Sequence, residues 1–164
     1  MADPDHLGLG ARLYTAFLGT TAGRWIALNI APKVDPWLMR VTRGHLGMAL
    51  MLPSTLLTTV GAQSRVLRTS AVLFFRDGDD VIVVASSFGR DRHPAWYHNL
   101  KANPHVHVGV GDGAVAMTAA EVRDPDELVR LWARADRIYP LFPDYRGRAA
   151  VSGRTIPIIR LSAS

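Results

Sequence analysis

Hydrophobic and polar residues alternate with a period of two over much of the chain after Pro53. Such alternation, in short runs bounded by turn residues, is typical of β-strands. It predicts strands at residues 54–60, 66–76, 81–86, 105–110, 114–123 and 156–161. The hairpin signals join consecutive strands too closely for parallel crossovers. We therefore expect an α+β fold that is mainly β, with an antiparallel barrel of six or seven strands.

Two helices are predicted between these strands, at residues 94–101 and 125–138. Asp124 is suited to cap the second helix, because Pro125 follows at the first helical position and Glu127 stands three residues after the cap. An aromatic and proline-rich connection, residues 139–145, is expected to lead towards the last strand.

The chain of 164 residues shows no linker, so we expect a single domain over residues 1–164. The apolar positions of the alternating runs predict the barrel core. These are Leu57, Val72, Phe74, Ile82, Val84, Val108 and Ile158.

Residues 1–45 have a different pattern and predict an N-terminal helical arm. Around residues 36–43, one helical side is apolar and carries Trp37, and the other is basic and carries Arg40 and Arg43. One interpretation is a segment that contacts a membrane surface. The alternative, which we favour, is a helix that packs on its own domain or on a second copy of the chain.

Charge and composition narrow the function classes. The net charge of +5 is carried almost wholly by arginine, which favours anionic ligands. The arginines are scattered and no nucleic-acid-binding motif accompanies them, so we expect no nucleic acid partner. The chain has no cysteine, which excludes disulfides and thiolate chemistry. The first residues do not resemble a secretory signal, so a cytoplasmic location is expected, with membrane association through the arm as an open alternative.

The usual catalytic and metal-binding motifs are absent from the sequence. His105 and His107 alternate on one predicted strand, but no third ligand follows at a useful spacing, so we predict no metal site. Asp77, Asp79 and Asp80 crowd a predicted hairpin tip, and a solvated turn explains them better than an acid/base pair.

A family resemblance provides a more specific hypothesis. The motif Pro-Ala-Trp-Tyr-His-Asn-Leu-Lys-Ala-Asn-Pro at residues 94–104 is its most specific part. Further parts are residues 57–61, Ser64, Arg68, residues 75–78 and residues 81–86, and the similarity covers roughly residues 46–161. With these motifs the chain resembles the deazaflavin-dependent nitroreductase family.

The resemblance implies a split β-barrel that holds 8-hydroxy-5-deazaflavin (coenzyme F-420) and transfers hydride to a quinone, nitro compound or enone. Flavin mononucleotide is a less favoured cofactor. The coenzyme carries the chemistry in such enzymes, so no catalytic side chain is expected. The resemblance also implies a homodimer, which the apolar N-terminal arm independently favours.

Candidate site residues follow from the resemblance. The implied coenzyme-binding residues are Gln63, Ser64, Arg65, Arg68, Ala71, Val84, Ala85, Ser86, Ser87, His93, Pro94, Trp96 and Tyr97. The implied substrate-binding residues are Leu73, Ser86, Tyr139, Phe142 and Tyr145. Apart from the resemblance, a turn rich in backbone donors near Ser64, with Arg68 close by, suits a phosphate or carboxylate group.

The sequence departs from the family pattern at several of these positions. Ala62 and Gln63 replace an Arg-Lys pair, Ser87 replaces a lysine, His93 replaces an asparagine and Ala71 replaces a proline. Arg65, Arg90 and Arg92 could compensate for the lost cations. The alternative hypothesis is a non-catalytic or differently liganded split barrel that binds a fatty acid, a quinone, flavin mononucleotide or haem.

Overall fold

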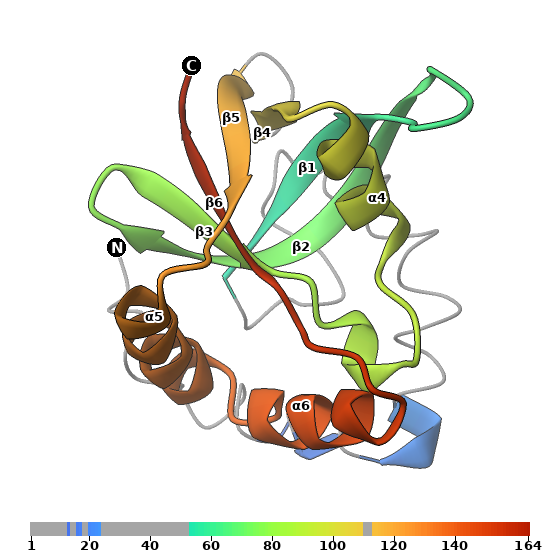
Figure 1. The fold of residues 1–164 in the computed structure, drawn as a ribbon, viewed down its shortest axis with the longest axis vertical. Helices are drawn as coiled ribbons and strands as arrows, with labels where there is room; N and C mark the ends of the chain where they lie inside the picture. The colour runs from blue at the N-terminus through green and yellow to red at the C-terminus, as the bar shows by residue number, and fades with distance from the viewer. Residues whose placement is uncertain (1–12, 14–15, 18–19, 24–52, 110–112) are drawn as a thin grey trace.

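The computed structural model describes residues 13, 16–17, 20–23, 53–109 and 113–164. Six strands form a closed antiparallel barrel in the order β1-β2-β3-β6-β5-β4 (Figure 1). Their bounds are β1 Ser54–Val60, β2 Leu67–Asp77, β3 Asp80–Val84, β4 His105–Val108, β5 Val115–Glu121 and β6 Ile158–Ala163. The predicted antiparallel barrel is confirmed. The predicted arm, residues 1–45, lies largely outside the described residues.

The helices lie outside the barrel in two places. The α4 helix, Ala95–Ala102, lies on one side of it, and α5, Pro125–Ile138, and α6, Phe142–Val151, lie together beyond one end of β3 and β6 (Figure 1). A short 3-10 helix, η1 (Ser87–Gly89), contacts α6. Among the described residues, no helix has both the length and the hydrophobicity needed to cross a membrane.

The start of α5 follows the predicted capping pattern. Asp124 Oδ1 accepts a hydrogen bond of 2.8 Å from the backbone N–H of Glu127, and Pro125 occupies the first turn. The expected connection at residues 139–145 was wrong in part, because α6 begins at Phe142. Pro143 is tolerated there because the first turn of a helix needs no N–H from it.

Hydrophobic side chains form two cores. One fills the barrel and includes Leu57, Val72 and Val108, with Trp96 and Leu100 of α4 packed against it. The other lies between the barrel and helices α5 and α6.

The predicted core positions divide between the two cores. Five of the seven are buried, but Ile82 and Ile158 belong to the helix-side core, and Phe74 and Val84 are only half-buried. Central residues of β3 are buried on both faces, so their alternation could not indicate which side faces the barrel interior.

An ion-pair network joins the β2–β3 hairpin to β6 and α5. Arg160 donates to Asp80 at 2.5 Å, to Asp77 at 2.7 Å and to Glu127, while Arg130 binds both oxygens of Asp77 at 2.6 and 2.8 Å. These arginines hold the pKa of Asp77 well below its usual range. The interpretation of this tip as a solvated turn was therefore wrong for Asp77 and Asp80.

We expect Asp77→Asn to lower the free energy of unfolding by about 1 to 2 kcal/mol at pH 7, because it leaves two guanidinium groups without their shared carboxylate. The folded-state pKa of Asp77 is depressed, so its contribution is complete at neutral pH, begins to fall below about pH 5, and is lost only when the pH passes below the folded-state pKa. Urea unfolding of wild type and variant at pH 7 and pH 3 measures this. The difference between the two curves should be smaller at pH 3 than at pH 7, and Asp79→Asn, which changes an exposed neighbour, should have little effect at either pH.

Candidate functional site

The turn between β1 and β2 is held in a defined shape by its own backbone. The N–H of Gly61 donates to the carbonyl of Val66, and the N–H of Arg65 donates to the carbonyl of Gly61, both at 2.9 Å. Arg65 adopts a positive φ of 57°. A side chain at position 61 would collide with Ser64 Oγ, which explains the glycine there.

Asn99 of α4 fixes this turn against the helix. Its side-chain oxygen accepts from the N–H of Ala62, and its Nδ2 donates to Thr59 Oγ1, both at 3.0 Å. Asn99 and Thr59 are both buried. Asn99 is the first of two asparagines in the 94–104 motif. It thus has a structural role, which the sequence analysis did not assign.

The outer side of the turn offers hydrogen-bond donors and positive charge. In the described part of the chain, the backbone N–H groups of Gln63 and Ser64 have no acceptor, and the exposed side chains of Arg65 and Arg68 form no ion pair. Donors and guanidinium groups in this arrangement can bind a phosphate or carboxylate.

Two predicted coenzyme residues on β2 lie on opposite faces of the strand. Arg68 pairs with Thr59, whose side chain points towards α4, whereas Ala71 pairs with Leu56 on the other face. Side chains alternate along a strand, so Ala71 shares its face with Leu73 and not with Arg68. The structure therefore groups Arg68 with the β1–β2 turn and Ala71 with the apolar end of β2.

The segment from β3 to α4, residues 85–93, follows an irregular path. Ser87, Phe88 and Gly89 have consecutive positive φ values of 47°, 56° and 73°. At the end of β3 the side chains still alternate: Val84 packs on the helix side, and Ala85 is buried in the barrel core. This segment, residues 85–93, is called the 85–93 loop below.

Two predicted coenzyme residues, Trp96 and Tyr97, lie in the first turn of α4, and a third, His93, lies just before the helix. Trp96 is buried in the barrel core and packs α4 on the barrel. The rings of His93 and Tyr97 lie 4.6 Å apart, and Tyr97 donates to Glu121 at 3.0 Å. Burial and the neighbouring Glu121 carboxylate raise the pKa of Tyr97, so its hydroxyl stays protonated at neutral pH.

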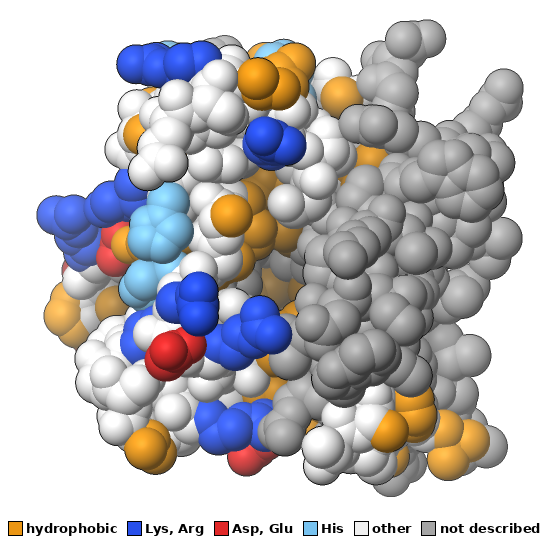
Figure 2. Space-filling view, turned by 90° about the vertical axis from the view of Figure 1, so that its right-hand side faces the viewer, with side chains coloured by type: hydrophobic (Ala, Val, Ile, Leu, Met, Phe, Trp, Pro, Cys, Tyr) orange, Lys and Arg blue, Asp and Glu red, His pale blue; other side chains and the backbone are white. Residues whose placement is uncertain are grey.

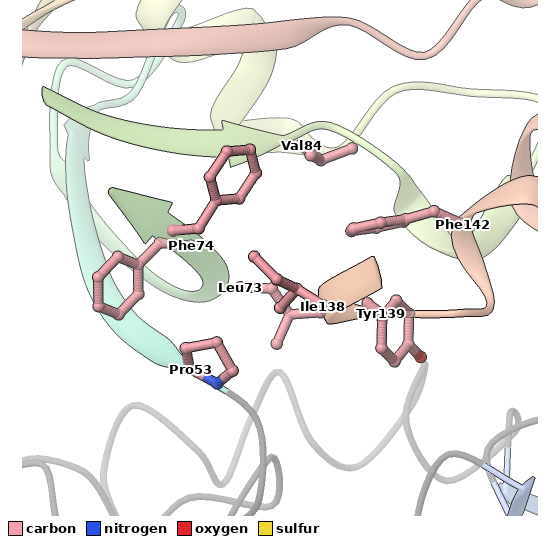
Figure 3. A pocket seen from close by; sticks show the side chains of 8 residues that line it. Pro53, Leu73, Phe74, Val84, Ile138, Tyr139 and Phe142 are labelled. Carbon is pink, nitrogen blue, oxygen red and sulfur yellow. The ribbon is translucent and has the colours of Figure 1, made fainter. Parts of the chain in front are cut away.

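A small apolar pocket lies where β2 and β3 meet the α5–α6 connection (Figure 3). The residues that line it are Pro53, Leu73, Phe74, Phe75, Val84, Ile138, Tyr139 and Phe142. Three predicted substrate residues, Leu73, Tyr139 and Phe142, therefore lie together, with the predicted coenzyme residue Val84 beside them. Of the other two, Tyr145 is buried, with its hydroxyl 2.9 Å from that of Tyr139, and Ser86 does not line the pocket.

Comparison with known proteins shows the family. The model of the F420H(2)-dependent quinone reductase family matches residues 33–162. The chain is 36% identical over 151 residues to an F420H(2)-dependent quinone reductase of Mycobacterium tuberculosis, covering 85% of this chain and 96% of that protein. The chain belongs to this family.

Solved structures agree with this membership. A chain described as an F420-H2 dependent reductase is 33% identical, with a TM-score of 0.58, and the match covers 67% of this chain and 94% of that one. Another, described as a domain-swapped dimer, is 27% identical, with a TM-score of 0.60, over 87% of this chain and all of that one. Both solved chains are similar in fold to the present chain.

Most of the coenzyme residues that the resemblance implied, other than Ala71 and Val84, belong to α4 or to the two segments next to it. The β1–β2 turn contacts its second turn, and the 85–93 loop leads into its first. Figure 2 shows the side on which α4 lies in Figure 1, where basic side chains and histidines border a recess with hydrophobic side chains inside it. The family's anionic coenzyme would meet positive charge on this side.

Sequence reasoning missed Arg154, a buried residue just before β6. Its guanidinium donates to the carbonyls of Ala85, Ser86 and Arg90 at 3.1, 2.6 and 2.7 Å. The sequence similarity included Arg154, but its distance from the loop along the chain gave no sign that it holds that loop. Arg90, which was expected to compensate for lost cations, contributes a carbonyl here, and its side chain is exposed.

The two strand histidines share one face of β4. His105 and His107 are both exposed on the outer face of β4, as their spacing predicts. Among the described residues, no three histidine, aspartate or glutamate side chains are grouped so that they could hold a metal ion.

Proposed function

We propose that this chain is a deazaflavin-dependent oxidoreductase that passes hydride from the reduced coenzyme to a quinone. Its membership of the F420H(2)-dependent quinone reductase family supports the reaction type. The observation that carries the proposal is a spatial one: Val84 lines the apolar Tyr139–Phe142 pocket, and the 85–93 loop leads from it along the chain to α4, against which the donor-rich β1–β2 turn is fixed. The apolar pocket suits a planar apolar acceptor, and the donor-rich β1–β2 turn beside α4 suits an anionic coenzyme.

The residues present fit the coenzyme despite the missing lysines. The free N–H groups of Gln63 and Ser64, with Arg65 and Arg68, would hold the anionic tail. Backbone donors and guanidinium groups replace point charges in this role, because both bind anion oxygens directionally. When bound, the reduced deazaflavin supplies the hydride, and the protein orients it and excludes water.

The aromatic pocket would form one wall of the acceptor site. Its free volume is about 10 Å³, which is near the minimum for one water molecule, so it marks the wall and not a complete quinone site. The faces of Tyr139 and Phe142 can stack on a quinone ring. The hydroxyls of Tyr139 and Tyr145 lie 2.9 Å apart beside this wall.

A titration followed by intrinsic fluorescence tests the coenzyme assignment. Trp96 and Tyr97 lie in α4, so binding nearby should change the protein's emission. We expect saturable binding of the deazaflavin and much weaker binding of flavin mononucleotide and haem. Preferential binding of haem or flavin mononucleotide would instead support the differently liganded barrel.

We propose a homodimer as the working assembly. The supporting observation is that the similar chain described as a domain-swapped dimer matches 87% of this chain. Multi-angle light scattering should give about twice the mass of 17.9 kDa at micromolar concentration. A monomeric mass for the intact chain at high micromolar concentration would contradict this.

We propose a cytoplasmic location for the enzyme. Contact of residues 36–52 with a membrane surface stays a prediction, because these residues lie outside the described part of the chain. Sedimentation of the protein with anionic lipid vesicles would test that contact.

A further inference from the structure

Arg154 is the one charged side chain among the described residues that is buried. Besides its three bonds to loop carbonyls, its NH1 lies 3.2 Å from Nδ1 of His93. The guanidinium therefore joins both ends of the 85–93 loop, at Ala85 and at His93, to the segment that precedes β6.

The charge of Arg154 has no carboxylate partner within ion-pair distance among the described residues. Its acceptors are neutral carbonyls and a histidine ring, and burial lowers its pKa. The more distant Asp91 partly offsets that effect. A buried cation without a counter-ion favours an anionic ligand nearby.

The contact with Arg154 also determines which nitrogen of His93 carries the proton. A guanidinium group has donors only, so Nδ1 must accept and cannot carry a hydrogen. Neutral His93 then has its proton on Nε2. Burial, Arg154 and His98 lower the pKa of His93, in that order, and Glu121 opposes them, so the ring stays neutral at pH 7.

The Nε2–H of His93 has no acceptor in the described part of the chain. The ring is held in place on one side by Tyr97 at 4.6 Å and lies half-buried beside the predicted coenzyme residue Pro94. A fixed ring with one unused donor is prepared to bind an acceptor atom of a ligand.

We propose that Arg154 is a positioning residue of the coenzyme site, which closes the 85–93 loop and holds His93 as the Nε2–H tautomer that donates a hydrogen bond to the bound deazaflavin. This inference rests on the proposed function. It also accounts for a departure from the family pattern, because histidine, like the usual asparagine, has both an acceptor for Arg154 and a donor for the ligand.

The tautomer can be tested without the coenzyme. Long-range ¹H–¹⁵N spectra of the histidine rings at pH 7.5 should show His93 with its proton on Nε2 in wild type. Arg154→Met, which removes every donor, should give a mixture of tautomers. A wild-type ring protonated on Nδ1 would overturn the proposal, as would an unchanged tautomer in a folded Arg154→Met protein.

Coenzyme binding tests the second part of the proposal, that His93 donates a hydrogen bond to the bound deazaflavin. His93→Phe keeps a ring against Tyr97 but removes the donor, so we expect binding to weaken about 3- to 10-fold with little change in thermal stability. The matched control is His98→Phe, an exposed histidine five residues along the chain, which should bind as wild type. Arg154→Lys should bind less tightly than wild type and more tightly than Arg154→Met.

The outcomes separate this inference from the proposed function. If wild type does not bind the deazaflavin, the proposed function fails, and the coenzyme role of His93 fails with it. If wild type binds and His93→Phe binds equally well, the proposed function stands and the inference is wrong. The His93→Phe protein also decides the matter if the Arg154 variants do not fold.

Discussion

Gly89→Ala should lower the free energy of unfolding by about 2 to 5 kcal/mol, measured by urea denaturation. Gly89 has a φ of +73°, a conformation that costs a non-glycine residue about 1 to 2 kcal/mol. A methyl group there would also meet the carbonyl oxygen of Tyr145 at 2.8 Å and Cβ of Arg148 at 3.1 Å. Pushing η1 away from α6 to relieve that contact adds a packing cost of about 1 to 3 kcal/mol.

Gly153→Ala is the matched control for this prediction. Gly153 has nearly the same φ, +71°, but an added Cβ would meet nothing within 4 Å. It should therefore cost only the conformational part, about 1 to 2 kcal/mol. Equal losses in the two variants would show that the contact between η1 and α6 does not determine the shape of the 85–93 loop.

Arg68→Ala should weaken deazaflavin binding about 10- to 100-fold. The side chain is exposed beside the donor-rich β1–β2 turn, and a charge-assisted contact to an anionic tail contributes about 1.5 to 3 kcal/mol. Added salt should weaken wild-type binding and affect the variant less, because the contact is screened. The fold should be retained, since an exposed side chain normally changes stability by less than about 0.5 kcal/mol.

Arg76→Ala separates a local contact from a general effect of charge. Arg76 is exposed near the other end of the same strand, so its removal changes the net charge equally. It should leave coenzyme binding unchanged. Equal weakening by both substitutions, or tight binding by Arg68→Ala, would mean that the tail binds elsewhere.

The alternating pattern and the turn residues between the strands were sufficient to predict a barrel of antiparallel strands. The order of the strands around the barrel was not predicted. The sequence also predicted the cap at Asp124, which depends only on neighbours in the chain. It did not predict that α6 begins at Phe142, because Pro143 and Gly147 resemble the residues of a connection.

The features of the site that the sequence did not predict depend on contacts between residues far apart in the chain. Arg154 reaches carbonyls 64 to 69 positions away, and no local pattern indicates which backbone groups a buried arginine will meet. Asp77 and Arg160 are likewise 83 positions apart. The resemblance supplied most of the candidate residues, but only the structure shows that Arg68 and Ala71 lie on different faces of β2.

The central claim is that this chain transfers hydride from the reduced deazaflavin to a quinone. The most direct measurement mixes purified protein with chemically reduced coenzyme and a soluble naphthoquinone without oxygen, and follows the absorbance of the oxidised coenzyme. The account predicts oxidation that needs both protein and quinone, saturates with each, and yields one quinol per coenzyme oxidised. A protein that binds the reduced coenzyme but leaves it unoxidised in the presence of a range of quinones would contradict it.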